Sequence, residues 1–300
     1  MNALYLRMTD PNGNFLGDFQ TNGFHRRLFE LACFAYLESA GFDLDRSREA
    51  PDFLVSRDGI SLAVEATTAN PPTGRDIDIS AFRMEKLTAE ELFAKVNEEF
   101  PRRMASILRK KVKHRYHELP QCSGKPLILM VAPFFEAGSV FYTDDALVDC
   151  LYGLEQVSRN SRATTPFFLM PEARAVSAVL YCNAFTVPRF FRLATPMNNT
   201  EEMIAIRRGF CYIEHEILPR EFEYQVGSPT SPKENWSEGV TMFLNPNALV
   251  PILPRLLPST STFSVRDGNP VRDVQGFHPV VSFMTVHVSN TEVTELTEVD

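Results

Sequence analysis

Cysteine is scarce in this sequence, and long apolar runs are missing. The five cysteines are an odd number with no CxxC pair, which argues against a disulfide framework and against a structural zinc site. No stretch approaches the roughly 18 consecutive apolar residues of a membrane-spanning helix. The N-terminal MNALYLRMTDPNGNF also lacks the charged-then-apolar order of a signal peptide. We therefore expect a cytoplasmic protein with no membrane partner.

The signatures of several common enzyme classes are also missing. There is no P-loop, no GxGxxG and no GxSxG pattern. Tryptophan occurs once and tyrosine eight times against 24 phenylalanines, which favours filling a core over stacking on bases. The net charge of −8 argues against a protein that coats nucleic acid through its total charge. Any site for a polyanion must therefore be local.

The hydrophobic content is sufficient for a large folded core. At 44% of 300 residues, it suits one large domain or a core domain with an extension. Apolar periodicity and turn signals predict helices over residues 24–40, 84–100, 102–118 and 144–154. A hairpin is predicted over residues 51–68, and buried strands over 126–132 and 175–182. This order predicts an α/β fold in which helices flank a mixed central sheet.

The character of the sequence changes near residue 197. Beyond this point short apolar pieces are separated by Pro, Asn, Gly and Ser, and no long helical pattern is present. No Ser/Gly-rich linker precedes the change. We therefore expect residues 1–196 to form an α/β core and residues 197–300 to form a β-rich or irregular extension packed on that core.

The segment PDFLVSRDGISLAVEATT, residues 51–68, is the most informative stretch. Asp58 and Gly59 tolerate positive φ angles and predict a tight turn between two apolar strands. The first strand then begins at Asp52, and the second ends near Glu65. Two carboxylates at neighbouring strand ends are unfavourable unless a positive group lies between them.

This spacing resembles the core of the PD-(D/E)XK nuclease superfamily, in which an aspartate and a glutamate on successive strands hold a divalent metal ion. Pro51 and Asp52 match the first element, and Glu65, Ala66 and Thr67 match the second. The resemblance implies a restriction-endonuclease-like core. It also implies that Asp52, Glu65 and the carbonyl oxygen of Ala66 bind Mg²⁺ or Mn²⁺. Thr67 stands where the family carries lysine, and its hydroxyl supplies no cation.

Some members of the superfamily supply this lysine from a neighbouring helix. We predict that Lys111 takes the role, because it is central in the basic helix predicted over residues 102–118. Lys110 and Lys113 are the alternatives.

Family members also often carry a glutamate on the helix before the first of these strands. Glu30 matches it, on an apolar row of the helix predicted over residues 24–40, and would bind a second ion or a metal-bound water. The alternatives are that Glu30 is a surface residue at a helix edge, or that Glu38 takes the role.

The only dense basic run in the chain lies on the helix predicted over residues 102–118. In an acidic protein it is the candidate phosphate-facing surface. The alternative is a solvated helix face opposite an apolar one. Besides Lys111, the predicted nucleic-acid-binding residues are Arg102, Arg103, Arg109, Lys110, Lys113 and Arg115.

A second resemblance spans residues 24–283. The runs HELPQCSGKPLILMVAPF, VEATTANP, AVSAVLYCN and LNPNAL are similar to a group of bacterial proteins of unassigned function. This resemblance implies a shared fold and a single unit rather than two exchangeable modules. It implies no reaction.

Three interpretations of the chain remain open. The first is a Mg²⁺-dependent endonuclease that cleaves DNA, an activity that the superfamily often uses in bacterial defence against foreign DNA. The second is a nuclease-fold subunit that has lost catalysis and binds nucleic acid or a protein partner. The third is that Asp52 and Glu65 are structural residues at strand ends. Homo-oligomers and partner subunits are compatible with all three.

Overall fold

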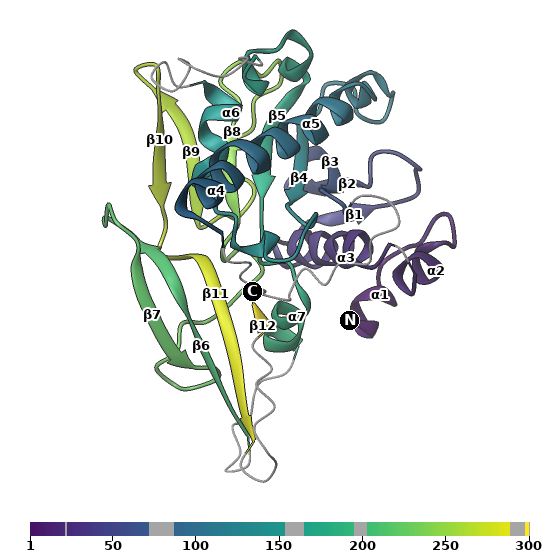
Figure 1. Cartoon of the computed structure of the whole chain (residues 1–300). Helices are drawn as coiled ribbons and strands as arrows, with labels where there is room; N and C mark the ends of the chain where they lie inside the picture. Colours follow the sequence, from purple (N-terminus) through teal and green to yellow (C-terminus); the bar gives the residue numbers. More distant parts are fainter. Residues whose placement is uncertain (22, 72–86, 154–164, 195–202, 289–297, 300) are drawn as a thin grey trace.

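The computed structural model describes residues 1–21, 23–71, 87–153, 165–194, 203–288 and 298–299. Within these residues the strands form a sheet of eight, with the order β1-β2-β3-β4-β5-β8-β9-β10, and a sheet of four, with the order β12-β11-β6-β7 (Figure 1). The strands of the larger sheet are β1 (Asp43–Asp45), β2 (Phe53–Arg57), β3 (Ile60–Thr68), β4 (Leu127–Ala132), β5 (Val176–Tyr181), β8 (Thr241–Leu244), β9 (Ser261–Arg266) and β10 (Asn269–Val274).

The larger sheet is mixed. β3, β4 and β5 are parallel, whereas β2 and β8 pair antiparallel with β3 and β5. Every residue of β4 and of β5 is buried, as expected of strands that are covered on both faces. The mixed central sheet and the two predicted strands at residues 126–132 and 175–182 are therefore confirmed.

Helices cover both faces of this sheet. α3 (Phe24–Ser39) packs on one face, in the same apolar cluster as Ile128 of β4. α5 (Phe100–Val112) packs on the other face, in the same cluster as Leu129 of β4. Successive side chains of a strand point to opposite faces, so β4 contributes alternately to the two clusters. The predicted helix over residues 24–40 is confirmed.

The predicted hairpin is confirmed. Asp58 and Gly59 have φ angles of 52° and 79°, and they connect β2 to β3. In the register of the two strands Phe53 pairs with Val64. The residue before Phe53 and the residue after Val64 therefore lie at the same end of the hairpin, which places Asp52 beside Glu65.

The helical segment before β4 differs from the prediction. Instead of two helices interrupted after residue 100, α4 (Ala89–Ala94), a π-helical turn (Lys95–Glu99) and α5 follow one another without a break. Pro101 does not break the segment and directly follows the π-helical turn, in which the amide of Phe100 donates to the carbonyl oxygen of Lys95. The capping box of Thr88 and Glu91 is present, and residues 84–86 lie outside the described residues.

α5 also ends earlier than predicted. It stops at Val112 rather than near residue 118, because Arg115 adopts a left-handed conformation with a φ angle of 53°. A 3₁₀ turn, Tyr116–Glu118, follows.

The remaining helices are short. The predicted helix over residues 144–154 consists of a 3₁₀ turn, Asp144–Leu147, and α6 (Val148–Tyr152), and its last predicted residue lies outside the described residues. Helices that the sequence did not predict are α1 (Asn2–Tyr5), α2 (Phe15–Phe19) and α7 (Val187–Ala194). Further 3₁₀ turns are Ser139–Phe141, Phe167–Leu169 and Pro171–Ala175. No helix in the described residues has both the length and the apolar character needed to cross a membrane.

The smaller sheet is antiparallel. It contains β6 (Met203–Ile213), β7 (Arg220–Gln225), β11 (Phe277–Val288) and β12 (Glu298–Val299). The described residues beyond 203 contain strands and no helix. Three of these strands, β8, β9 and β10, extend the larger sheet through the pairing of β8 with β5. The larger sheet therefore contains residues from both sides of the predicted boundary at 196–197, and a division there stays a prediction.

Candidate active site

Asp52 and Glu65 are linked to each other at the end of the hairpin. The backbone amide of Asp52 donates a hydrogen bond to Oε2 of Glu65 at 3.2 Å. The backbone amide of Ala66 in turn donates to Oδ2 of Asp52 at 2.8 Å. The strand pairing thus orients both carboxylates, as the sequence predicted for their relative position.

The end of α5 brings two further groups to Glu65. Nζ of Lys111 lies 2.6 Å from Oε1 of Glu65, and the hydroxyl of Tyr116 donates to the same oxygen at 2.9 Å. Lys111 lies in the last turn of α5, and the left-handed Arg115 turns the chain so that Tyr116 also meets Glu65. Among the three candidate lysines, Lys111 is the one that contacts this carboxylate, while Lys110 and Lys113 are exposed. Its catalytic role stays a prediction.

Both carboxylates face a cavity of about 180 Å³, which we call the carboxylate cavity. It is lined by all the residues predicted for the catalytic and metal site, together with other side chains. The predicted residues are Glu30, Asp52, Glu65, Ala66, Thr67 and Lys111. One small volume therefore collects residues from α3, the hairpin and α5.

The surroundings of the carboxylate cavity disfavour the ionised form of Asp52. Burial, together with the charges of Glu65 and Glu30, raises the pKa of Asp52 to about 8. The amide of Ala66 and the ammonium of Lys111 act in the opposite direction without cancelling the increase. Burial and the neighbouring Glu65 also raise the pKa of Tyr116, which remains a neutral hydrogen-bond donor. A bound cation would relieve the repulsion that a bound proton otherwise relieves on Asp52.

Glu30 lies in the wall of the carboxylate cavity but is held by arginines. Oε2 of Glu30 accepts a hydrogen bond from Nη1 of Arg27 at 2.7 Å, and Oε1 forms an ion pair with Arg46. The residue is 4% exposed, so the interpretation of Glu30 as a surface residue is wrong. Glu38, the alternative, pairs with Arg7 at 2.7 Å and does not line the cavity.

The donor set suits a hard divalent cation. Asp52 and Glu65 supply carboxylate oxygens and Ala66 a carbonyl oxygen, the ligand types that Mg²⁺ prefers. Within the described ranges no group of three or more His, Cys, Asp or Glu side chains is arranged to hold a metal ion. The predicted set contains only two such side chains, Asp52 and Glu65. The residues therefore fit Mg²⁺ or Mn²⁺ with water completing its coordination.

Several arginines of the basic run are paired with other groups, so fewer of its cations are available to a phosphate than the sequence indicates. Arg103 pairs with Glu99 at 3.0 Å, and Nη2 of Arg109 donates to the carbonyl oxygen of Thr165 at 2.6 Å. Arg102 lies 3.9 Å from Glu98, and Arg115 pairs with Glu118. Lys110 and Lys113 are exposed and do not line the carboxylate cavity. A nucleic-acid-binding role for this run stays a prediction.

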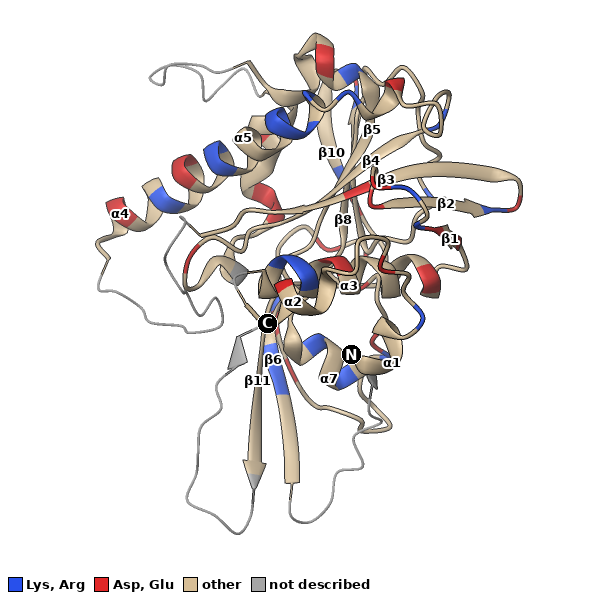
Figure 2. Ribbon diagram, turned by 90° about the vertical axis from the view of Figure 1, so that its right-hand side faces the viewer, with Lys and Arg blue, Asp and Glu red and all other residues tan. Residues whose placement is uncertain are grey.

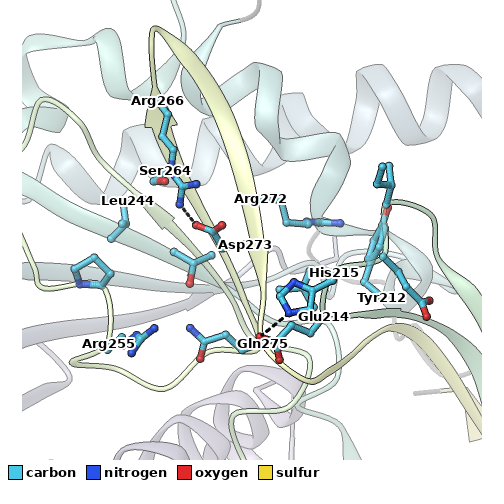
Figure 3. Close-up of a pocket in the computed structure, with 15 residues that line it drawn as sticks. Tyr212, Glu214, His215, Leu244, Arg255, Ser264, Arg266, Arg272, Asp273 and Gln275 are labelled. Carbon is cyan, nitrogen blue, oxygen red and sulfur yellow. Dashed lines mark hydrogen bonds and ion pairs between the residues drawn. The ribbon is translucent and has the colours of Figure 1, made fainter.

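A larger cavity, of about 740 Å³, lies between the end of β6 and strands β8, β9 and β10 (Figure 3). Its charged groups are largely engaged with one another. Arg266 pairs with Asp273, and Arg272 stacks on Tyr212 at 4.5 Å while it pairs with Asp144 at 2.6 Å. None of the residues predicted for catalysis or nucleic-acid binding lines it. We therefore retain the carboxylate cavity as the candidate site.

No protein-family model matches the chain, and no significant match was found among curated proteins or solved structures. The site consequently rests on its own geometry and on the resemblance in the hairpin.

Four residues around the cavity were not identified from the sequence. These are Arg26, Arg27, Arg46 and Tyr116. The adjacent arginines at the start of an apolar helix were a usable signal for the first two. Nothing in the spacing identifies Tyr116, because the turn after α5 breaks the helical periodicity.

Proposed function

We propose that this protein is a metal-dependent nuclease of the PD-(D/E)XK type that hydrolyses phosphodiester bonds of DNA. The observation that supports the proposal is the contact of Lys111 with Glu65 in the cavity that Asp52 also lines. The lysine that is missing at position 67 has a counterpart on another element, in reach of the same carboxylate. If Asp52 and Glu65 had a purely structural role at the strand ends, their carboxylates would not need to face a cavity.

Each residue has a distinct role in this proposal. Asp52, Glu65 and the carbonyl oxygen of Ala66 would hold Mg²⁺, which would supply charge neutralisation at the phosphoryl oxygens and lower the pKa of water. Tyr116 and Lys111 orient Glu65 through its Oε1 atom. The ammonium of Lys111 also adds positive charge beside the attacked phosphate, as charge develops in the transition state. Asp52 releases its proton before it becomes a ligand.

A second candidate function rests on the hydrogen bonds of Glu65. Oε1 accepts from Lys111 and Tyr116, and Oε2 accepts from the amide of Asp52. This is the arrangement expected where an internal lysine replaces the metal ion. The protein would then be a nuclease-fold subunit without catalysis that binds DNA or a protein partner.

Incubation of the purified protein with supercoiled plasmid and linear duplex DNA, in Mg²⁺, Mn²⁺ or EDTA, tests the proposal. We expect cleavage that requires the metal ion and that falls at least about 100-fold in Glu65→Gln, because the substitution removes a charged ligand. Glu38→Gln is the matched control, since this glutamate lies on α3 outside the cavity. Absence of cleavage, with no Mn²⁺ binding by calorimetry, would refute hydrolysis and favour the binding subunit.

A further inference from the structure

The wall of the carboxylate cavity opposite α5 is also basic. Arg26 and Arg27, from the first two turns of α3, line the cavity together with Asp52 and Glu65. Figure 2 shows α5 on one side of the ends of β2 and β3, and α2 and α3 on the other side, with basic residues on both. Cationic side chains thus lie on two sides of the carboxylates.

A set of alternating ion pairs holds this second wall in place. Asp18 of α2 binds Arg26 and Arg27, each at 2.6 Å. Arg27 also binds Glu30, and Glu30 binds Arg46. Three arginines therefore share two carboxylates, so this wall keeps a positive charge. The side chain of Arg26 is 51% exposed and keeps part of its guanidinium available to solvent.

Arg26 can bind a phosphate with the part of its guanidinium that stays exposed beside Asp18. Its planar guanidinium presents several donors, and it loses less conformational freedom on binding because Asp18 restricts it beforehand. On the other wall, Lys111 is in contact with Glu65, and the exposed Lys110 is its neighbour on α5. A chain of phosphates that crosses the cavity from α5 towards α3 would meet cations before and after the carboxylates.

We infer that a DNA strand crosses the carboxylate cavity between α5 and α3, and that Arg26 binds a phosphate next to the one held at the carboxylates. The inference rests on the proposed function and adds the path of the substrate. Arg26 contacts substrate in this arrangement, whereas Asp18 is a positioning residue that acts through Arg26 and Arg27.

Binding of a fluorescent single-stranded DNA of about 20 nucleotides, followed by anisotropy in EDTA at several salt concentrations, tests the path. We expect Arg26→Ala to weaken binding about 3- to 10-fold and to reduce the slope of log K against log salt by about 0.7, the value for one phosphate contact. Arg26→Lys should keep the slope, because it keeps the charge. Asp18→Asn removes a carboxylate that competes with phosphate for Arg26, so it should not weaken binding as Arg26→Ala does.

Arg7→Ala provides a closely matched control. Arg7 pairs with Glu38 at 2.7 Å, and the two side chains are 50% and 36% exposed, against 51% and 37% for Arg26 and Asp18. Arg7 does not line the cavity, so its variant should bind as the wild type does. Equal affinities and slopes for the two alanine variants would overturn the path, and so would absence of DNA binding by the wild type.

The experiment separates this inference from the proposed hydrolysis. An Arg26-dependent slope without any cleavage in Mg²⁺ would refute the hydrolysis and keep the path. Metal-dependent cleavage with a slope that does not depend on Arg26 would refute the path and keep the hydrolysis.

Discussion

The carboxylates at the hairpin end differ sharply from those of a second buried group, which we call the arginine cluster. In the arginine cluster Glu234 lies 2.7 Å from Arg192 and 3.1 Å from Arg189. Glu238 lies 2.6 Å from Arg207. Arg189 and Arg207 have no exposed surface. The cluster joins α7 and β6 to the loop before β8, so its contacts connect the two sheets.

The two groups show opposite pKa changes under similar burial. Burial by itself raises the pKa of Glu234, but Arg189 and Arg192 outweigh it and lower the value to about 2. Asp52 has Glu65 and Glu30 as neighbours besides one lysine, and its pKa rises to about 8. In the arginine cluster three guanidinium groups outnumber two carboxylates, whereas Asp52 is buried beside two other carboxylates and one lysine. A proton on Asp52, or a cation bound beside it, relieves the cost of burying this carboxylate.

The largest expected effect is on stability, from Glu234→Gln. This change leaves Arg189 and Arg192 buried with little counter-charge, and we expect a loss of about 3–5 kcal/mol in the free energy of unfolding. Urea denaturation measures it. Glu216→Gln, in an exposed pair with Arg220 at 3.2 Å, should cost less than about 0.5 kcal/mol. Equal stabilities of the two variants would show that the arginine cluster does not hold the fold together.

Lys111→Met should affect the chemistry rather than the fold. Loss of the ammonium should slow metal-dependent cleavage about 10- to 100-fold, because a positive charge near the phosphate is lost. The same change should tighten Mn²⁺ binding in calorimetry, since Glu65 no longer shares Oε1 with a competing cation. Lys233→Met is the control and should leave both quantities unchanged, as Lys233 is exposed and does not line the cavity. An equal loss of cleavage in the two variants would show that the contact of Lys111 with Glu65 does not determine the rate of cleavage.

The smallest expected effect is the pH dependence contributed by Asp52. Its pKa is 3.8 ordinarily and about 8 in the folded protein, so the folded protein binds the proton more tightly. The stability that this proton contributes is complete below about pH 4 and is lost as the pH rises towards 8. In EDTA, Asp52→Asn should therefore be more stable than the wild type at pH 8, by about 1–2 kcal/mol, and less different at pH 5.

Chemical denaturation at these two pH values measures this difference. Mg²⁺ should stabilise the wild type and not the Asp52→Asn variant, because the variant lacks a charged ligand. Asp45→Asn is a control outside the cavity, on exposed β1. If Asp52→Asn were less stable than the wild type at pH 8, this result would contradict the raised pKa of Asp52.

The sequence predicted the hairpin more accurately than the helices. Asp58 and Gly59 specify a turn by their own conformational preferences, and alternation then places the neighbouring strand residues. The end of α5 was predicted too late, because Arg115 leaves the helix although no Gly or Pro marks the position. β9 and β10 were not predicted, since their half-buried residues show no clear alternation. The surroundings of Glu30 were also missed, because Arg46 reaches it from outside α3, although Arg27 lies on the same helix.

By itself, the sequence determined that Asp52 and Glu65 stand side by side, because a tight turn and the period of a strand are local properties of the chain. The tertiary structure decided which cation meets them. Lys111 is 46 residues from Glu65 in the chain, and their contact depends on how α5 crosses the sheet and where it ends. The tertiary structure also decided that Glu30 pairs with Arg46 as well as with Arg27 of its own helix, because folding brings Arg46 to α3. The local sequence pattern of the hairpin places Asp52 beside Glu65, and long-range packing determines which charged groups surround them.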